Sequence, residues 1–166
     1  MTAFKSPALA GVTGIKPSKP RRVAPSGILH FTISVSDLER ARRFYEDIVG
    51  ATYWRQNDST VFMRCGEQYF VLSKGRTKEH VPPNDGREIL MHHAFLVQGD
   101  DFDAAVAHLE ANSVEILLYE DKGHRSFTGR HLYFHDPDGN AIEFIDFQGI
   151  GDVNAPAYEG RERRRK

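Results

Sequence analysis

The chain repeats one pattern, and this repeat constrains its fold more than any other feature of the sequence. The segments HFTISV (30–35) and HHAFLV (92–97) each begin with histidine and end with valine five residues later. An acidic turn and a run with helical hydrophobic periodicity follow each segment, and three short strand-like stretches come after that run. This internal similarity predicts two modules with the same strand–helix–three-strand order, which can pair and enclose a cleft.

Hydrophobic periodicity places one helix in each half. The first is expected at about 37–49, where Ser36 and Glu39 form a capping box, and the second at about 101–111, with Asp100 as its cap. Further strands are expected over 51–56, 60–65 and 68–74 in the first half, and over 114–120, 130–135 and 141–147 in the second. The expected fold class is α+β, with two tandem βαβββ modules whose curved mixed sheets enclose the cleft.

Charge and composition divide the chain into five parts. They are a basic flexible N-terminal tail (1–26), the first module (27–74), a polar linker (75–88), the second module (89–148) and a basic C-terminal tail (149–166). The tails are expected to aid solubility, and nucleic acid is not expected as a partner. The single cysteine, Cys65, excludes an internal disulfide framework and suits a reducing compartment, so we expect a cytoplasmic protein. No apolar run approaches the roughly 20 residues that a membrane span needs.

Three residues in the matching segments predict a metal site in the cleft. His30 and His92 open the two repeated strands, and Glu143 closes the segment DPDGNAIE (136–143). Two imidazoles and one carboxylate leave open positions on a divalent ion, which is typical of a catalytic site. His92 and its neighbour His93 must point to opposite faces of a strand, and counting back from the terminal valine of each repeat favours His92.

Polar rings precede Glu143 at alternating positions. His131, Tyr133 and His135 share one face of the expected strand, and His124 lies shortly before it. Histidine and tyrosine beside a Lewis acid can donate a proton to a substrate oxygen, so these residues are candidates for catalysis or for the substrate pocket. The alternative for His131 and His135 is an ordinary amphipathic strand with exposed rings.

The sequence resembles the vicinal oxygen chelate superfamily over about residues 28–147. The resemblance rests on the segments HFTISVSDLERARRFYEDIVG, HHAFLV and YFHDPDGNAIEF, and the DPDGN turn before an acidic residue is its most specific element. The superfamily includes glyoxalases, bleomycin-resistance proteins, fosfomycin-modifying enzymes and extradiol ring-cleaving dioxygenases. Membership implies paired βαβββ modules, a metal ion held by ligands from both halves and, by analogy, a homodimer.

The order of residues around the DPDGN turn is similar to that of the extradiol dioxygenases. By this resemblance, His124 and Tyr133 would contact a catechol or its oxygen-derived intermediate. The expected function is therefore a dioxygenase that cleaves a catechol-like substrate with O₂, using Fe(II) as the favoured ion and Mn(II) or Zn(II) as alternatives.

Two alternative functions remain open within the superfamily. One is a metal-dependent lyase, isomerase or fosfomycin-type thiol transferase, for which Arg125 and Arg130 are candidate phosphonate-binding cations. The other is a small-molecule binder of the bleomycin-resistance type, which needs no metal.

Phe70 qualifies all of these assignments. When the two halves are aligned on Gly66 and Gly139, Phe70 occupies the position of Glu143 and is expected to line the substrate pocket. Glyoxalase I has a fourth ligand at that position, and extradiol dioxygenases have a histidine close to it. Phenylalanine can replace neither, so the alignment argues against glyoxalase chemistry and leaves a dioxygenase without its usual acid–base group.

Overall fold

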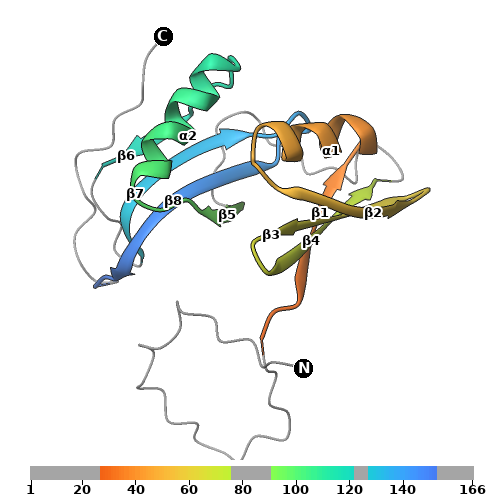
Figure 1. Cartoon of the computed structure of the whole chain (residues 1–166), viewed down its shortest axis with the longest axis horizontal. Helices are drawn as coiled ribbons and strands as arrows, with labels where there is room; N and C mark the ends of the chain where they lie inside the picture. The colour runs from red at the N-terminus through yellow and green to blue at the C-terminus, as the bar shows by residue number, and fades with distance from the viewer. Residues whose placement is uncertain (1–26, 76–90, 122–126, 153–166) are drawn as a thin grey trace, which may run out of the picture.

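The computed structural model describes residues 27–75, 91–121 and 127–152 (Figure 1). The expected N-terminal tail, most of the expected linker and positions 153–166 of the expected C-terminal tail lie outside these residues. The start of that C-terminal tail is corrected, because strand β8 continues to Ile150. The described elements are β1 (His30–Val35), α1 (Leu38–Asp47), β2 (Thr52–Asn57), β3 (Thr60–Cys65), β4 (Gln68–Lys74), β5 (His92–Leu96), α2 (Asp100–Ala111), β6 (Leu118–Glu120), β7 (Phe127–His135) and β8 (Ala141–Ile150). No helix among them is long and apolar enough to cross a membrane.

The strands form two four-stranded sheets with the same topology. Their orders are β1-β4-β3-β2 and β5-β8-β7-β6. In each sheet the first strand is parallel to the fourth, and the other neighbours are antiparallel. This arrangement confirms the predicted α+β fold of two tandem βαβββ modules. The strand predicted at 114–120 is shorter than expected, since β6 covers only Leu118–Glu120.

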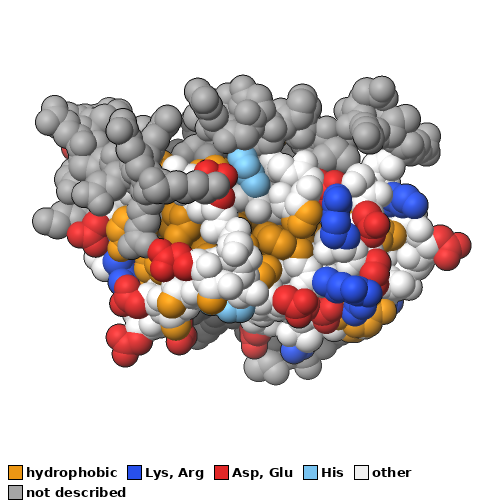
Figure 2. All heavy atoms as spheres, turned by 90° about the horizontal axis from the view of Figure 1, so that it is seen from above, with side chains coloured by type: hydrophobic (Ala, Val, Ile, Leu, Met, Phe, Trp, Pro, Cys, Tyr) orange, Lys and Arg blue, Asp and Glu red, His pale blue; other side chains and the backbone are white. Residues whose placement is uncertain are grey.

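The N-cap of helix α1 lies one residue later than predicted. Asp37, not Ser36, is the N-cap, and its carboxylate accepts a hydrogen bond from the backbone N–H of Arg40. The inner face of the helix buries Ala41 and Tyr45. Its outer face carries intermixed charges of both signs, as Figure 2 shows on the side where α1 lies. The amphipathic pattern therefore places the helix as predicted, with a different capping residue.

Helix α2 is anchored from a distant strand. Its N-cap is Gly99, which has a positive φ of 59° and provides no side-chain cap, so the prediction of Asp100 as the cap is corrected. The Gly99 N–H instead donates to the Asp146 carboxylate on β8 at 3.0 Å. Arg130 donates to the Gly99 carbonyl and to Asp146, so β7 and β8 together hold the start of the helix.

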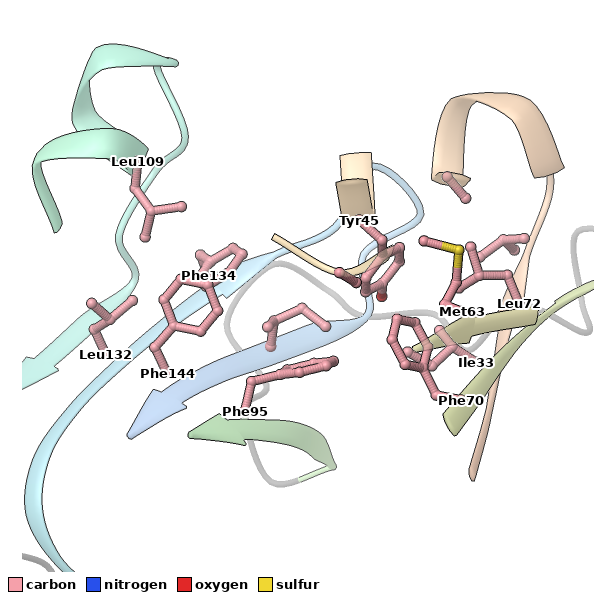
Figure 3. Close-up of a cluster of buried hydrophobic side chains, with 14 of the residues drawn as sticks. Ile33, Tyr45, Met63, Phe70, Leu72, Phe95, Leu109, Leu132, Phe134 and Phe144 are labelled. Atoms are coloured by element: carbon pink, nitrogen blue, oxygen red, sulfur yellow. The ribbon is translucent and has the colours of Figure 1, made fainter. Parts of the chain in front are cut away.

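One hydrophobic core connects the two modules beneath the helices (Figure 3). Phe70 of the first module packs against Tyr45 with ring centroids 5.3 Å apart, and against Phe95 of the second module at 5.5 Å. Phe31 stacks on Phe70 and also on His93, with ring centroids 5.0 Å apart in the second pair. The sheets thus share the interior on their helix-covered side, which leaves their opposite faces for a site.

The DPDGN turn of the second module docks onto the first module. Tyr45 donates from its hydroxyl to the Asp136 carboxylate at 3.0 Å, and Asn140 donates from its side-chain amide to the Ser34 carbonyl at 3.0 Å. Arg40 forms an ion pair with Asp138 at 2.7 Å. These contacts join residues about 100 positions apart and fix the turn from which β8 and Glu143 continue.

Candidate metal centre

The face of the second sheet opposite α2 gathers the acidic and imidazole groups. Backbone register aligns Ala94 of β5 with Glu143 of β8, and Glu143 with Tyr133 of β7. Side chains alternate along a strand, so His92 and His131, each two residues from this row, point to the same face. Leu132 and Phe144 point into the core instead.

His92 and Glu143 form the centre of this face. The His92 Nε2 atom lies 3.0 Å from Glu143 Oε2, and the Glu143 residue is 4% exposed. Two donors about 2.1 Å from one ion are about 3 Å apart when they occupy adjacent octahedral positions, so the pair is suited to share a divalent ion. His93 lies on the opposite face against Phe31, where burial lowers its pKa, with a further contribution from His92.

A hydrogen-bond network holds the Glu143 carboxylate. Tyr133 donates from its hydroxyl to Oε1 at 2.6 Å, and His131 Nδ1 lies 2.6 Å from the same oxygen. Burial alone would raise the pKa of Glu143, but hydrogen bonds from His131, His92 and Tyr133 outweigh burial and lower the pKa to about 2. The carboxylate is therefore ionised at neutral pH, as a metal ligand must be.

His30 lies apart from this pair within the single chain. It is exposed on β1, in the other sheet, where it aligns with Tyr69 of β4. Among the described residues, no three histidine, cysteine or acidic side chains are grouped closely enough to hold an ion. One chain therefore assembles two of the three predicted ligands and leaves His30 on the first module.

Phe70 differs from its predicted position. It is 1% exposed and faces the core under α1, so it does not line a pocket on the open face. The register shows why: His30 aligns with Tyr69, as His92 aligns with Ala141, which makes Val71 the counterpart of Glu143. A slip of one residue in the alignment moves a side chain to the other face of the sheet. Valine cannot ligate a metal, so the first module still provides no acidic ligand at this position.

The remaining predicted residues fall into three groups. His135 lies on the site face, in register with Ala141, and its Nε2 is buried without a hydrogen-bond partner. His124 and Arg125 lie outside the described residues. Arg130 is on the helix side, paired with Asp146, so it is not directed toward the site.

Glu120, which the sequence analysis missed, is 3% exposed and aligns with His131 from β6. Only its strand register could have revealed it.

Comparison with known proteins identifies the family. The sequence model of the Glyoxalase/Bleomycin resistance protein/Dioxygenase superfamily matches residues 27–144. The chain belongs to this superfamily. It is 32% identical over 114 residues to the glutathione transferase FosA of Serratia marcescens, covering 69% of this chain and 76% of that protein. It is 30% identical over 117 residues to the metallothiol transferase FosB of Lysinibacillus sphaericus, covering 70% and 79%.

Solved structures show the same fold at lower identity. The fosfomycin resistance protein FosX of Listeria monocytogenes, in complex with Mn(II) and 1S,2S-dihydroxypropylphosphonic acid, has a TM-score of 0.59 at 22% identity and covers 75% of this chain and 93% of that one. A lactoylglutathione lyase of Agrobacterium tumefaciens has a TM-score of 0.57 at 23% identity, with coverage of 73% and 93%.

These relatives change the order of the functional hypotheses. The curated relatives are thiol transferases, so they favour the fosfomycin-type alternative over the predicted extradiol dioxygenase. A divalent metal is in keeping with the family, and Mn(II) is the ion named in the FosX complex. Nothing in the comparisons supports Fe(II), a catechol substrate or O₂ for this chain.

Proposed function

We propose that this protein is a divalent-metal-dependent transferase that adds a thiol to a small electrophilic substrate of the fosfomycin type. The observation that carries the proposal is the buried, ionised Glu143 carboxylate 3.0 Å from His92 Nε2, on the open face of the second sheet. The similarity to FosA and FosB, both named as transferases, supports the reaction class. Mn(II) is the favoured ion because the related FosX was solved with it.

The residues of the site suit this reaction. His92 and Glu143 would hold the ion, which when bound acts as a Lewis acid on a substrate oxygen. Fosfomycin carries an epoxide, so the thiol sulfur bonds to one ring carbon, the C–O bond breaks, and the oxygen takes the thiol proton. The buried hydrogen bonds from Tyr133 and His131 keep the Glu143 carboxylate in one orientation during this change.

The third ligand, His30, is proposed to come from a second copy of the chain. Within one copy it sits on the exposed face of the other sheet, beside Tyr69 and Thr32. In a symmetric dimer, this face of one copy can cover the Glu143 face of its partner, so that each site takes ligands from both chains.

Mixing two inactive variants tests the shared site. His30→Ala and Glu143→Ala homodimers should each lack activity and tight Mn(II) binding. After unfolding and refolding together, half of the dimers are mixed, and each mixed dimer has one intact site, so about a quarter of the wild-type sites should return. Failure to recover any Mn(II) binding in a refolded, dimeric mixture would contradict a site built from two copies.

The activity is tested directly with purified, Mn(II)-loaded protein. Incubation with fosfomycin and glutathione, or with cysteine, should yield a thiol adduct seen by ³¹P NMR, and Glu143→Gln should abolish it. Formation of a diol in the absence of thiol would show that the protein hydrolyses the epoxide and does not transfer a thiol to it. No consumption of fosfomycin with either thiol or with water, in protein that binds Mn(II), would overturn the proposal. O₂ uptake with catechols serves as the control for the dioxygenase hypothesis.

A further inference from the structure

The two oxygens of the Glu143 carboxylate have different surroundings. Oε1 lies 2.6 Å from the Tyr133 hydroxyl and 2.6 Å from His131 Nδ1. Oε2 lies 3.0 Å from His92 Nε2. A carboxylate oxygen has about two lone-pair positions, so the two contacts at Oε1 use its hydrogen-bonding capacity. Oε2 is therefore the oxygen that faces His92, the other predicted metal ligand on this sheet.

A backbone carbonyl fixes the orientation of the His131 ring. The His131 Nε2 atom lies 3.1 Å from the Phe127 carbonyl oxygen, which can only accept a hydrogen bond. One ring nitrogen therefore faces the Phe127 carbonyl, and the other faces Oε1 of Glu143 at 2.6 Å. The ring is 2% exposed and lies parallel to the Tyr133 ring, with an interplanar angle of 10°. Both nitrogens of His131 are thus occupied by the protein, which leaves neither for a substrate.

This contact requires β7 to bend between Phe127 and His131. Residues four apart in a straight strand are separated by about 13 Å, too far for the His131 ring to reach the Phe127 carbonyl. The pairing of β7 with β8 shifts between Thr128 and Gly129, because Gln148 is an extra residue in β8 at this point, and Gly129 has a φ of 137°. A Cβ at this position would lie 1.9 Å from the Asp146 carbonyl oxygen, so the bend requires glycine. The bend at Gly129 therefore lies opposite the bulge of β8 and brings the Phe127 carbonyl toward the His131 ring.

We propose that His131 is a positioning residue for Glu143, and that it restrains Oε1 so that Oε2 alone is offered to the metal ion beside His92. The chain of contacts runs from the bend at Gly129 through the Phe127 carbonyl to His131 and then to Glu143. This role replaces the predicted role of His131 in the substrate pocket. It rests on the metal site of the proposed function and names a residue outside the expected ligand set. Hydrogen-bonded partners of metal ligands commonly change metal affinity by about 10- to 100-fold when removed.

Mn(II) titration followed by EPR tests the role without an activity assay. His131→Leu removes the donor to Oε1 and should weaken Mn(II) binding by about 10- to 100-fold. His131→Asn keeps an amide donor near Oε1 and should recover part of the loss. The matched control is His108→Asn, which removes an exposed imidazole on α2 far from Glu143 and should leave Mn(II) affinity unchanged. Circular dichroism verifies that each variant is folded.

The outcomes separate the two proposals. If the wild type binds no divalent ion, the metal site fails and the role of His131 fails with it. If the wild type binds Mn(II) and folded His131→Leu binds it equally well, only the positioning role is overturned. If His131→Leu does not fold, His131→Asn is compared with Tyr133→Phe and with the double variant. A weaker Mn(II) affinity in His131→Asn, and losses that are not additive in the double variant, would support a shared hold on Oε1. Additive or absent effects contradict it.

Discussion

The two modules have the same strand order but treat one equivalent position differently. In the second module, Glu143 lies beside Ala94, two residues after His92. In the first module, Val71 lies beside Thr32, two residues after His30. Both modules therefore place a histidine at the start of the first strand and one residue of the last strand near it. That residue is Glu143 in the second module and Val71 in the first, so only the second module has a carboxylate beside its histidine. The repeat provides the frame, and the substitution at one position makes the site asymmetric.

The two modules also differ in their last turn and in how the N-terminus of their helix is held. The first module closes β3 and β4 with a two-residue turn at Gly66 and Glu67, whereas the second uses the five-residue turn 136–140, which docks onto α1. Helix α1 is capped locally by Asp37, but α2 depends on Asp146 of β8. The second module is thus tied into distant parts of the chain at the strand that carries Glu143. A rigid scaffold of this kind suits a metal ligand.

The largest expected effect tests the difference between Glu143 and Val71. Glu143→Gln removes the negative charge and one ligand oxygen and should weaken Mn(II) binding by more than about 100-fold, measured by calorimetric titration. Val71→Ala, at the equivalent position of the first module, should lower stability but leave Mn(II) affinity within about twofold of wild type. Equal losses of affinity in both variants would show that the two modules contribute alike.

The docked turn should matter more than its counterpart in the first module. Asn140→Ala removes the donor to the Ser34 carbonyl and to the buried Asp136 carboxylate, and should cost about 2–3 kcal/mol in the free energy of unfolding, measured by urea denaturation. Glu67→Ala, in the exposed two-residue turn, should change it by less than about 0.5 kcal/mol. Similar losses at both turns would remove the distinction.

Removing the Asp146 anchor of α2 should lower the free energy of unfolding by an amount that depends on pH. The Gly99 N–H and Arg130 lower the pKa of Asp146 below its ordinary value of 3.8. Because the folded pKa is lowered, its stabilising contribution is complete above 3.8 and is lost as the pH falls through the folded value. Asp146→Asn should therefore cost about 1–2 kcal/mol at pH 7, and the difference from wild type should shrink as the pH falls below 3.8.

Asp103→Asn is the control for this anchor. It removes the other carboxylate partner of Arg130, whose side chain is 73% exposed, and should cost less than about 1 kcal/mol at pH 7. If this variant and Asp146→Asn are equally destabilised in urea at pH 7, the anchor does not depend on the contact with Gly99.

The smallest expected effect concerns the local cap of α1. Asp37→Ala removes the acceptor for the Arg40 N–H and should lower the urea midpoint by less than Asp146→Asn does, because water can satisfy the exposed end of this helix. Arg43→Ala, an exposed helix position, serves as the control and should leave the midpoint nearly unchanged. A larger loss for Asp37→Ala than for Asp146→Asn would reverse the comparison.

Local periodicity was enough to predict the elements of both modules and the choice of His92. Alternation along a strand placed His92 and His93 on opposite faces, and the structure brings His92 to Glu143 while His93 packs against Phe31. The alignment on glycine turns was wrong by one residue at Phe70, because the two turns differ in length and only strand pairing reveals the register. The capping residues also differed, because Asp37 is as good a cap as Ser36 and because the Asp146 carboxylate of β8 replaces a local cap at Gly99.

The sequence by itself determined the two βαβββ modules and proposed the residue types of the candidate metal site, because hydrophobic period and turn chemistry are local properties. Tertiary structure alone decided that Tyr133 and His131 hold Oε1 of Glu143 and that His30 lies apart from Glu143 within one chain, because these relations depend on strand register and on how the two sheets pack. Register and packing are set by contacts between separate strands and helices, which no local pattern specifies.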